Sequence, residues 1–113
     1  MKRAVTLKEN YEFRRLYQRG KSAAGGTMVL YCRKNRLGHN RLGLTASTKL
    51  GHAVVRNRVR RRLREIYRLH EDRFAPGWDI VVVARSRCVG ADFRKLTHAY
   101  LSLAEKAGVL QPR

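Results

Sequence analysis

The sequence predicts an α+β fold, an α/β sandwich in which three helices pack on a mostly antiparallel sheet of four strands, in the order α-β-β-β-α-β-α. Three observations support this prediction. Three segments repeat apolar residues at helical spacing, two segments alternate apolar and polar residues, and Asp79–Ala84 is a continuous apolar run. At 113 residues, the chain is expected to form a single domain, residues 1–113, around one core.

The first helix is expected from about Leu7 to Arg19. Thr6 and Glu9 have the spacing of a capping box, in which a hydroxyl and a carboxylate satisfy unpaired amides at a helix start. Gly20 is expected to end this helix with a positive φ, since glycine adopts that conformation without steric cost.

Two segments have the period-two alternation of strands. In Thr27–Arg33 and Arg41–Ser47 every second residue is apolar, and in the first of these Tyr31 falls on the opposite face from Cys32. The short polar segment between them predicts that the two strands pair antiparallel.

The second half of the chain predicts a helix, a strand and a helix. Ala53–Arg73 carries an apolar stripe and is closed by Pro76-Gly77; the stripe consists of Val55, Val59, Leu63, Ile66 and Leu69. Asp79–Ala84 is typical of a central strand buried on both faces, and it could be the parallel neighbour of Arg41–Ser47. The last helix is expected over Ala91–Lys106, with a stripe of Phe93, Leu96, Tyr100, Leu103 and Ala107.

The charge of the chain predicts a polyanionic partner. Its 26 Lys and Arg against 8 Asp and Glu give a formal net charge of +18. Between Phe13 and Arg64 there are 15 basic residues and no acidic one. A solvated surface normally mixes both signs, so nucleic acid is the first expectation and an anionic membrane the second.

Cysteine usage and hydropathy favour a cytoplasmic protein. Cys32 and Cys88 are too few and too distant for a disulfide-rich fold, and both are expected to be reduced. No apolar run follows the basic residues of Met1–Thr6, so no signal peptide is expected, and no stretch approaches the roughly 18 apolar residues of a membrane span. We therefore expect no membrane association.

The segment Arg56–Arg64 predicts an RNA-binding helix. It holds six arginines in nine positions. Helical geometry places a polar face opposite the apolar stripe. This polar face consists of Arg56, Asn57, Arg60, Arg61, Arg64 and Arg68. Guanidinium groups bind phosphates bidentately and stack on bases. The alternative is a solvated amphipathic helix, which the near-absence of Glu at i±4 disfavours.

The residue sequence around this segment resembles a motif of one protein family. Lys49–Arg61, which spells KLGHAVVRNRVRR, is similar to the Arg-Asn-Arg signature of the ribonuclease P protein family. Glu12-Phe13, the aromatic Tyr17, and Val29-Leu30-Tyr31 resemble the family's first helix and first long strand, as Gly43–Lys49 resembles the strand that enters the motif. The C-terminal half resembles the family in its pattern of apolar and polar residues rather than residue by residue.

The resemblance implies a left-handed β-α-β crossover that carries the basic helix, an exception to the usual hand. It also implies contact with the catalytic RNA subunit of ribonuclease P, which trims the 5′ ends of precursor tRNAs. The residues expected to make it are Arg56, Asn57, Arg58, Arg60 and Arg61, to which the helical face adds Arg64 and Arg68.

A second implication is a cleft between the first helix and the sheet that holds the single-stranded 5′ leader of precursor tRNA. Phe13, Tyr17 and Tyr31 would line it, flanked by three cations, Arg14, Lys21 and Lys49. Exposed aromatic rings stack on unpaired bases without demanding a sequence. For Phe13 the alternative of a core residue stays open, because an aromatic stripe on a helix is often buried.

Two departures from the family pattern stand out. Arg62 falls within the apolar stripe of the basic helix and is expected to snorkel past the sheet edge, unless the helical register is shifted. Thr48 occupies a position that is frequently basic in relatives, so the contribution of that turn to RNA contact is open.

The sequence predicts no active site in the protein. Its carboxylates are scattered, and His39, His52, His70 and His98 lie in four different elements without ligand spacing. We expect a non-catalytic subunit, monomeric and in a 1:1 complex with RNA, with a dimer of the holoenzyme left open. The resemblance implies that the RNA carries the hydrolysis and binds most of the Mg²⁺. The alternatives are a small basic ribosomal protein and, less favoured, a DNA-binding regulator.

Overall fold

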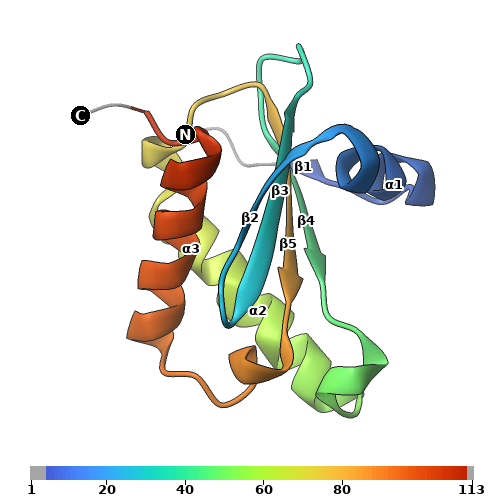
Figure 1. Ribbon diagram of the computed structural model, residues 1–113, viewed down its shortest axis with the longest axis vertical. Helices are drawn as coiled ribbons and strands as arrows, with labels where there is room; N and C mark the ends of the chain where they lie inside the picture. The colour runs from blue at the N-terminus through green and yellow to red at the C-terminus, as the bar shows by residue number, and fades with distance from the viewer. Residues whose placement is uncertain (1–4, 112–113) are drawn as a thin grey trace.

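The computed structural model describes residues 5–111 and confirms the α+β class (Figure 1). Three α-helices and three short 3₁₀ segments accompany a sheet of five strands. The order is β1 (Val5–Thr6), α1 (Asn10–Arg19), β2 (Lys21–Ala24), β3 (Met28–Lys34), β4 (Arg41–Thr45), η1 (Thr48–Leu50), α2 (Ala53–Leu69), η2 (Glu71–Arg73), β5 (Trp78–Ala84), η3 (Ser86–Cys88) and α3 (Phe93–Ala107).

The sheet is mixed rather than mostly antiparallel, with the strand order β1-β4-β5-β3-β2. β5 is the central strand, antiparallel to β3 and parallel to β4. The predicted central position and the parallel neighbour are thus confirmed. The predicted antiparallel pairing of β3 with β4 is wrong, because the apolar β5 inserts between them and pairs with both.

The sheet has two differently covered faces (Figure 1). α2 and α3 lie on one side, where they bury the main core with alternate residues of β3 and β5, such as Leu30 and Val82. α1 lies on the other side and forms a smaller cluster, in which Leu16 packs with Leu7 and Val81. Among residues 5–111, no helix combines the length and apolarity that a membrane span requires.

The start and end of α1 differ from the prediction. The capping box consists of Glu9 and Glu12 rather than Thr6 and Glu9, because Thr6 is taken up by β1, a strand too short to be seen in the sequence. Gly20 has φ −79° instead of a positive value. A glycine is required there by close approach, since a Cβ would lie 2.6 Å from the Leu16 carbonyl oxygen and 2.8 Å from that of Cys32.

The ends of α2 and α3 are fixed by local chemistry. α2 stops at Leu69, four residues earlier than predicted, and continues as η2. Leu69 is exposed and Tyr67 is buried in its place. α3 starts two residues later than predicted because Asp92 caps it by accepting from the Arg94 amide at 3.1 Å.

Candidate nucleic-acid interface

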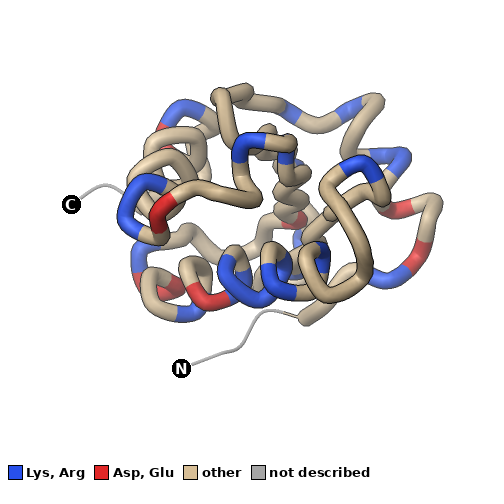
Figure 2. Tube along the Cα trace, turned by 90° about the horizontal axis from the view of Figure 1, so that it is seen from below, with Lys and Arg blue, Asp and Glu red and all other residues tan. Residues whose placement is uncertain are grey.

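The arginines of α2 lie on a largely exposed face of the helix. Val59, Leu63 and Ile66 are buried against the sheet, as predicted. On the other side Asn57, Arg58, Arg61, Arg64 and Arg68 are exposed, whereas Arg56 and Arg60 are partly buried. Figure 2 shows lysine and arginine positions on most segments of the trace and acidic positions on few. This face of α2 can therefore approach a polyanion.

Two members of the α2 face are held by neighbours. Arg60 donates from Nη2 to Asn57 Oδ1 at 2.6 Å, which orients both side chains one turn apart. Arg68 forms an ion pair with Glu65, and hydrogen bonding to Arg68 lowers the pKa of that carboxyl. The Glu65 carboxylate offsets part of the charge of Arg68, so the N-terminal arginines carry more of the uncompensated charge.

Arg62 has a structural role that the sequence did not reveal. Its guanidinium donates to the Ala91 carbonyl oxygen at 2.7 Å and lies 6.0 Å from the ring centroid of Phe93. The helical register is therefore as predicted, but the side chain joins α2 to the segment that enters α3 instead of reaching past the sheet edge.

An aromatic pair lies between α1 and the sheet. The ring centroids of Tyr17 and Tyr31 are 4.9 Å apart at an interplanar angle of 68°. Tyr17 is 41% exposed, and its hydroxyl lies 3.4 Å from Oγ1 of Thr45 on β4. These two tyrosines form an edge-to-face pair with one ring open to solvent, as a base-stacking site requires.

Phe13 packs against the sheet instead of standing open beside the tyrosines. A Cβ on Gly43 would lie 2.7 Å and 2.9 Å from two carbons of its ring, so the ring rests on the glycine backbone. The ring centroid is 6.5 Å from that of Tyr17, and Phe13 borders the small core around Leu16. Its packing on Gly43 supports the core alternative, although one side of the ring stays accessible.

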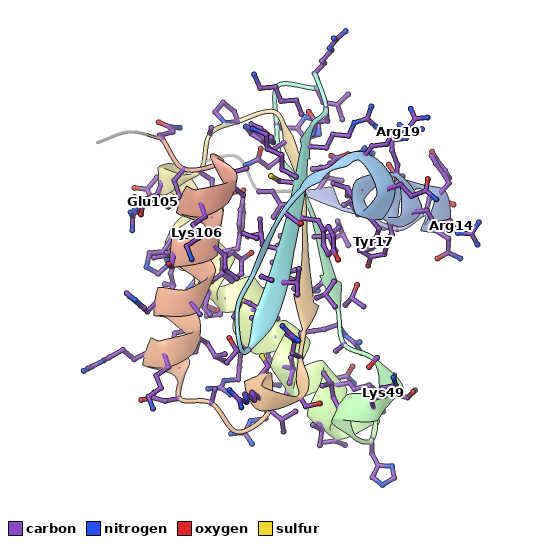
Figure 3. All side chains as sticks on the ribbon, in the orientation of Figure 1. Arg14, Tyr17, Arg19, Lys49, Glu105 and Lys106 are labelled. Atoms are coloured by element: carbon purple, nitrogen blue, oxygen red, sulfur yellow. The ribbon has the colours of Figure 1, made fainter. Side chains whose placement is uncertain are left out.

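Beyond the tyrosine pair, no helix within residues 5–111 covers the α1 side of the sheet. The strand registers align Val29 of β3, Val83 of β5 and Thr45 of β4 in one row, and all three are only partly buried. Figure 3 shows Tyr17 beneath α1 and Lys49 further along the same side of the sheet. We call this surface, bounded by Tyr17 and Lys49, the open sheet face.

The other two predicted cations do not lie on the open sheet face. Figure 3 shows Arg14 on the outer side of α1, and it is exposed. Lys21 pairs in register with Cys32, which faces the main core, whereas its neighbour Ser22 pairs with Tyr31. Because side chains alternate along a strand, Lys21 projects on the opposite face from Tyr31. Of the three, the structure brings only Lys49 to the open sheet face.

Arg41 was not predicted as part of the site, yet it connects α1 to the sheet. Its Nε and Nη2 donate to the two carboxylate oxygens of Asp79 at 2.8 Å and 2.7 Å, and its Nη1 donates to Glu12 on α1. Hydrogen bonding to Asp79 raises the pKa of Arg41. No sequence signal links residues so far apart, and one basic residue among many gave no reason to single it out.

Within residues 5–111, no group of three or more His, Cys, Asp or Glu side chains could hold a metal ion. Both cysteines are free and buried. Burial raises the pKa of the Cys32 and Cys88 thiols, so neither is an activated nucleophile.

Comparison with known proteins identifies the family. The family model described as Ribonuclease P matches residues 1–108. The chain is 40% identical over 111 residues to the ribonuclease P protein component of Natranaerobius thermophilus, covering 98% of this chain and 96% of that one. It is 44% identical over 105 residues to that of a Thermoanaerobacter species, covering 93% and 90%.

Solved structures agree with the sequence matches. The RNase P protein of Staphylococcus aureus superposes with a TM-score of 0.87 at 32% identity, covering 96% of this chain and 100% of that one. The RNase P protein from Thermotoga maritima gives 0.79 at 31% identity, covering 86% and 92%. With its Arg-Asn-Arg helix and mixed sheet, this chain belongs to the ribonuclease P protein family.

Proposed function

We propose that this chain binds the catalytic RNA subunit of ribonuclease P through α2 and the 5′ leader of precursor tRNA on the open sheet face. In this role it assists the endonucleolytic removal of the leader. The observation that carries the proposal is the open sheet face itself. It presents an accessible aromatic pair and a lysine beside a helix rich in arginine, in a family that the comparisons identify.

The α2 face supplies the contact with the RNA subunit. Arg58, Arg61 and Arg64 are exposed, and no ion pair holds them among the described residues. Each phosphate that such a group neutralises releases condensed counterions, which makes binding salt-dependent. The buried stripe on the opposite side of the helix fixes the direction in which these side chains project.

The open sheet face supplies the contact with the leader. An unpaired base can stack on the accessible side of Tyr17, with Tyr31 held edge-to-face behind it. Lys49 provides a cation for the phosphates of a strand that crosses the face. Stacking on tyrosine is tolerant of sequence, which suits leaders that differ between precursor tRNAs.

The hydrolysis is assigned to the RNA subunit, which also binds most of the Mg²⁺. Several carboxylates of the protein already have structural partners: Arg41 holds Glu12 and Asp79, Arg68 holds Glu65, and Asp92 caps α3. These groups are committed to the fold. We propose a cytoplasmic 1:1 complex of one protein with one RNA.

The test is cleavage of precursor tRNA by a bacterial ribonuclease P RNA at low, near-physiological magnesium, with and without this protein. Substrates with a long leader and with none are compared. Rescue by the protein that is larger for the long leader is expected. No rescue with any cognate RNA would refute the proposal and leave a ribosomal RNA-binding role as the next candidate.

Matched variants test the two proposed surfaces separately. Replacing Tyr17 and Tyr31 by Leu is expected to weaken binding of the long-leader substrate about 10-fold, since stacking contributes roughly 1–3 kcal/mol per base. Tyr11→Leu is the control, because Tyr11 is 58% exposed on α1 and its ring lies beside Arg15 rather than against Tyr17 or Tyr31. Leaderless substrate should not distinguish these variants.

For the α2 surface, Arg61→Ala is expected to weaken binding to the RNA subunit and to reduce the salt dependence of binding by about one phosphate contact. Lys106→Ala is the control, since Lys106 is exposed on α3 and lies far from Lys49 and α1 (Figure 3). Equal losses for both variants would mean that only net charge matters.

A further inference from the structure

A groove outside the open sheet face runs along the outer edge of β4. It has a volume of about 440 Å³, within the range of small-molecule sites. Its apolar walls come from Leu7, Phe13, Leu42 and Leu44, and arginines of α2 form its rim. Leu42 and Leu44 pair in register with Ile80 and Val82 of the main core, whereas Phe13 rests on Gly43 on the α1 side. The groove therefore spans the edge of the sheet between α1 and α2.

The groove exists because β1 is only two residues long. β1 pairs with Arg41 and Leu42, and the last bond of the pairing runs from the Leu7 amide to the Leu42 carbonyl oxygen at 3.0 Å. Backbone groups alternate along a strand, so the N–H and C=O of Leu44 point to the same side as those of Leu42. The chain has left the sheet by then, and Leu44 has no backbone partner on this edge within residues 5–111.

The rim of the groove is cationic at one end. Arg60 and Arg64 lie one helical turn apart on α2, and neither forms an ion pair with a described carboxylate. Arg60 is partly buried and is oriented by its bond to Asn57. At the other end, Arg68 is paired with Glu65 and the carboxylate of Glu71 also lines the groove. An anionic group is therefore attracted to the end formed by Arg60 and Arg64.

These features match the parts of a nucleotide. A flat base fits between the Phe13 ring and the leucine side chains, where it can stack on the ring. The free donor and acceptor of Leu44 suit the polar edge of a base, and the two guanidinium groups suit a phosphate. A peptide strand would be a poor occupant, because only one residue of β4 offers free backbone groups on this edge.

We propose that this groove receives one unstacked nucleotide of the catalytic RNA subunit, with its base against Phe13 and Leu44 and its phosphate at Arg60 and Arg64. The proposal rests on the proposed function. The RNA subunit is the source because both arginines belong to the α2 face. The leader is assigned to the open sheet face, at Tyr17 and Tyr31.

The first experiment places a photocrosslinker at the groove. Thr6 lines the groove and is exposed, so Thr6→Cys gives a thiol at its mouth, and the native Cys32 and Cys88 are buried and should remain unlabelled. In the complete holoenzyme with bound precursor tRNA, the crosslink should map to one unpaired position of the RNA subunit. Glu105→Cys on α3 is the control and should not crosslink there (Figure 3). A crosslink to the leader, or none to RNA, would overturn the proposal.

The second experiment fills the groove. Thr6→Trp places a large ring at the exposed mouth without altering the core, and Thr6→Ser is the matched control. Loss of one stacked base should weaken binding to the RNA subunit about 10-fold for Thr6→Trp and leave it unchanged for Thr6→Ser. If both bind like the parent, the groove is empty in the complex and the proposal fails, while the proposed function stands. If the parent protein itself does not bind the RNA subunit, the proposed function fails first.

Discussion

Replacing Arg41 tests how α1 is held on the sheet. The Arg41 guanidinium spans two carboxylates, Asp79 on the central strand β5 and Glu12 in the first turn of α1. Asp79 also accepts from the Asn35 side chain at 2.9 Å. The side chains of Glu12 and Asp79 are only 10% and 13% exposed. Arg41→Ala therefore leaves two poorly hydrated carboxylates close together without their cation.

The expected cost follows from this burial. Removing one partner of a buried ion pair costs about 3–5 kcal/mol. The Arg41 side chain is itself 23% exposed, so water screens part of the interaction and the lower end applies, about 3 kcal/mol. With an m-value of about 2 kcal/mol per molar urea, the unfolding midpoint should fall by about 1.5 M.

The assay is urea unfolding followed by circular dichroism, with Arg33→Ala as the control. Arg33 pairs in register with Asp79 from the other neighbouring strand, and it forms no ion pair within residues 5–111. Its loss should cost less than about 1 kcal/mol, as for a surface charge. Equal destabilisation by the two variants would refute the argument, because it would show that loss of any cation in this row has the same effect.

Three further changes test the packing. Gly43→Ala brings a Cβ to 2.7 Å from the Phe13 ring and should cost about 1–3 kcal/mol in the same urea assay; an unchanged midpoint would mean that the ring is free to move. Cys32 and Cys88 should react with a thiol reagent only after unfolding, since burial raises both pKa values, and rapid labelling of the native protein would contradict their burial. Complete burial raises the pKa of Tyr100 far above its usual range, and its hydroxyl lacks a partner among the described residues. The unfolded state then loses this proton first, so stability falls as pH rises above about 10. Tyr100→Phe should be neutral or stabilising at pH 7 and should reduce that alkaline loss; a large loss of stability at pH 7 would show that the hydroxyl is bonded.

Local patterns predicted the elements well because their causes are local. The stripe Val59, Leu63 and Ile66 is buried as the helical spacing required, and β5 is central as its unbroken apolar run required. Apart from the helix ends, the errors concern pairing between distant segments. β3 and β4 follow one another in the chain, but hydrophobic burial is greatest when β5 lies between them. A polar loop that joins two paired strands has the same sequence pattern as one that joins strands separated by a third strand. β1 is too short to have a pattern at all.

The candidate site shows the same division. The arginine face of α2 followed from helical geometry and from the charge of the segment. The side on which Lys21 projects could not be predicted, because a shift of one residue in strand register moves a side chain to the other face. The packing of Phe13 on Gly43 depends on a contact between residues 30 apart in the numbering, as the bridge from Glu12 to Arg41 depends on residues 29 apart. No single stretch of sequence contains such contacts.

The unequal coverage of the sheet explains why the basic block and the proposed RNA-binding surfaces coincide. The helix α1 is ten residues long, so it covers only one end of its face of the sheet and leaves Val29 and Val83 partly exposed. The helices α2 and α3 cover the other face of the sheet. The segments around the open sheet face and the β4 groove include most of α1, β3, β4 and the first half of α2, and from Phe13 to Arg64 the chain contains no acidic residue. An acidic side chain on these segments would face a phosphate. Two of the acids nearby, Glu12 and Glu65, are paired with Arg41 and Arg68, so part of their charge is offset where RNA is proposed to bind.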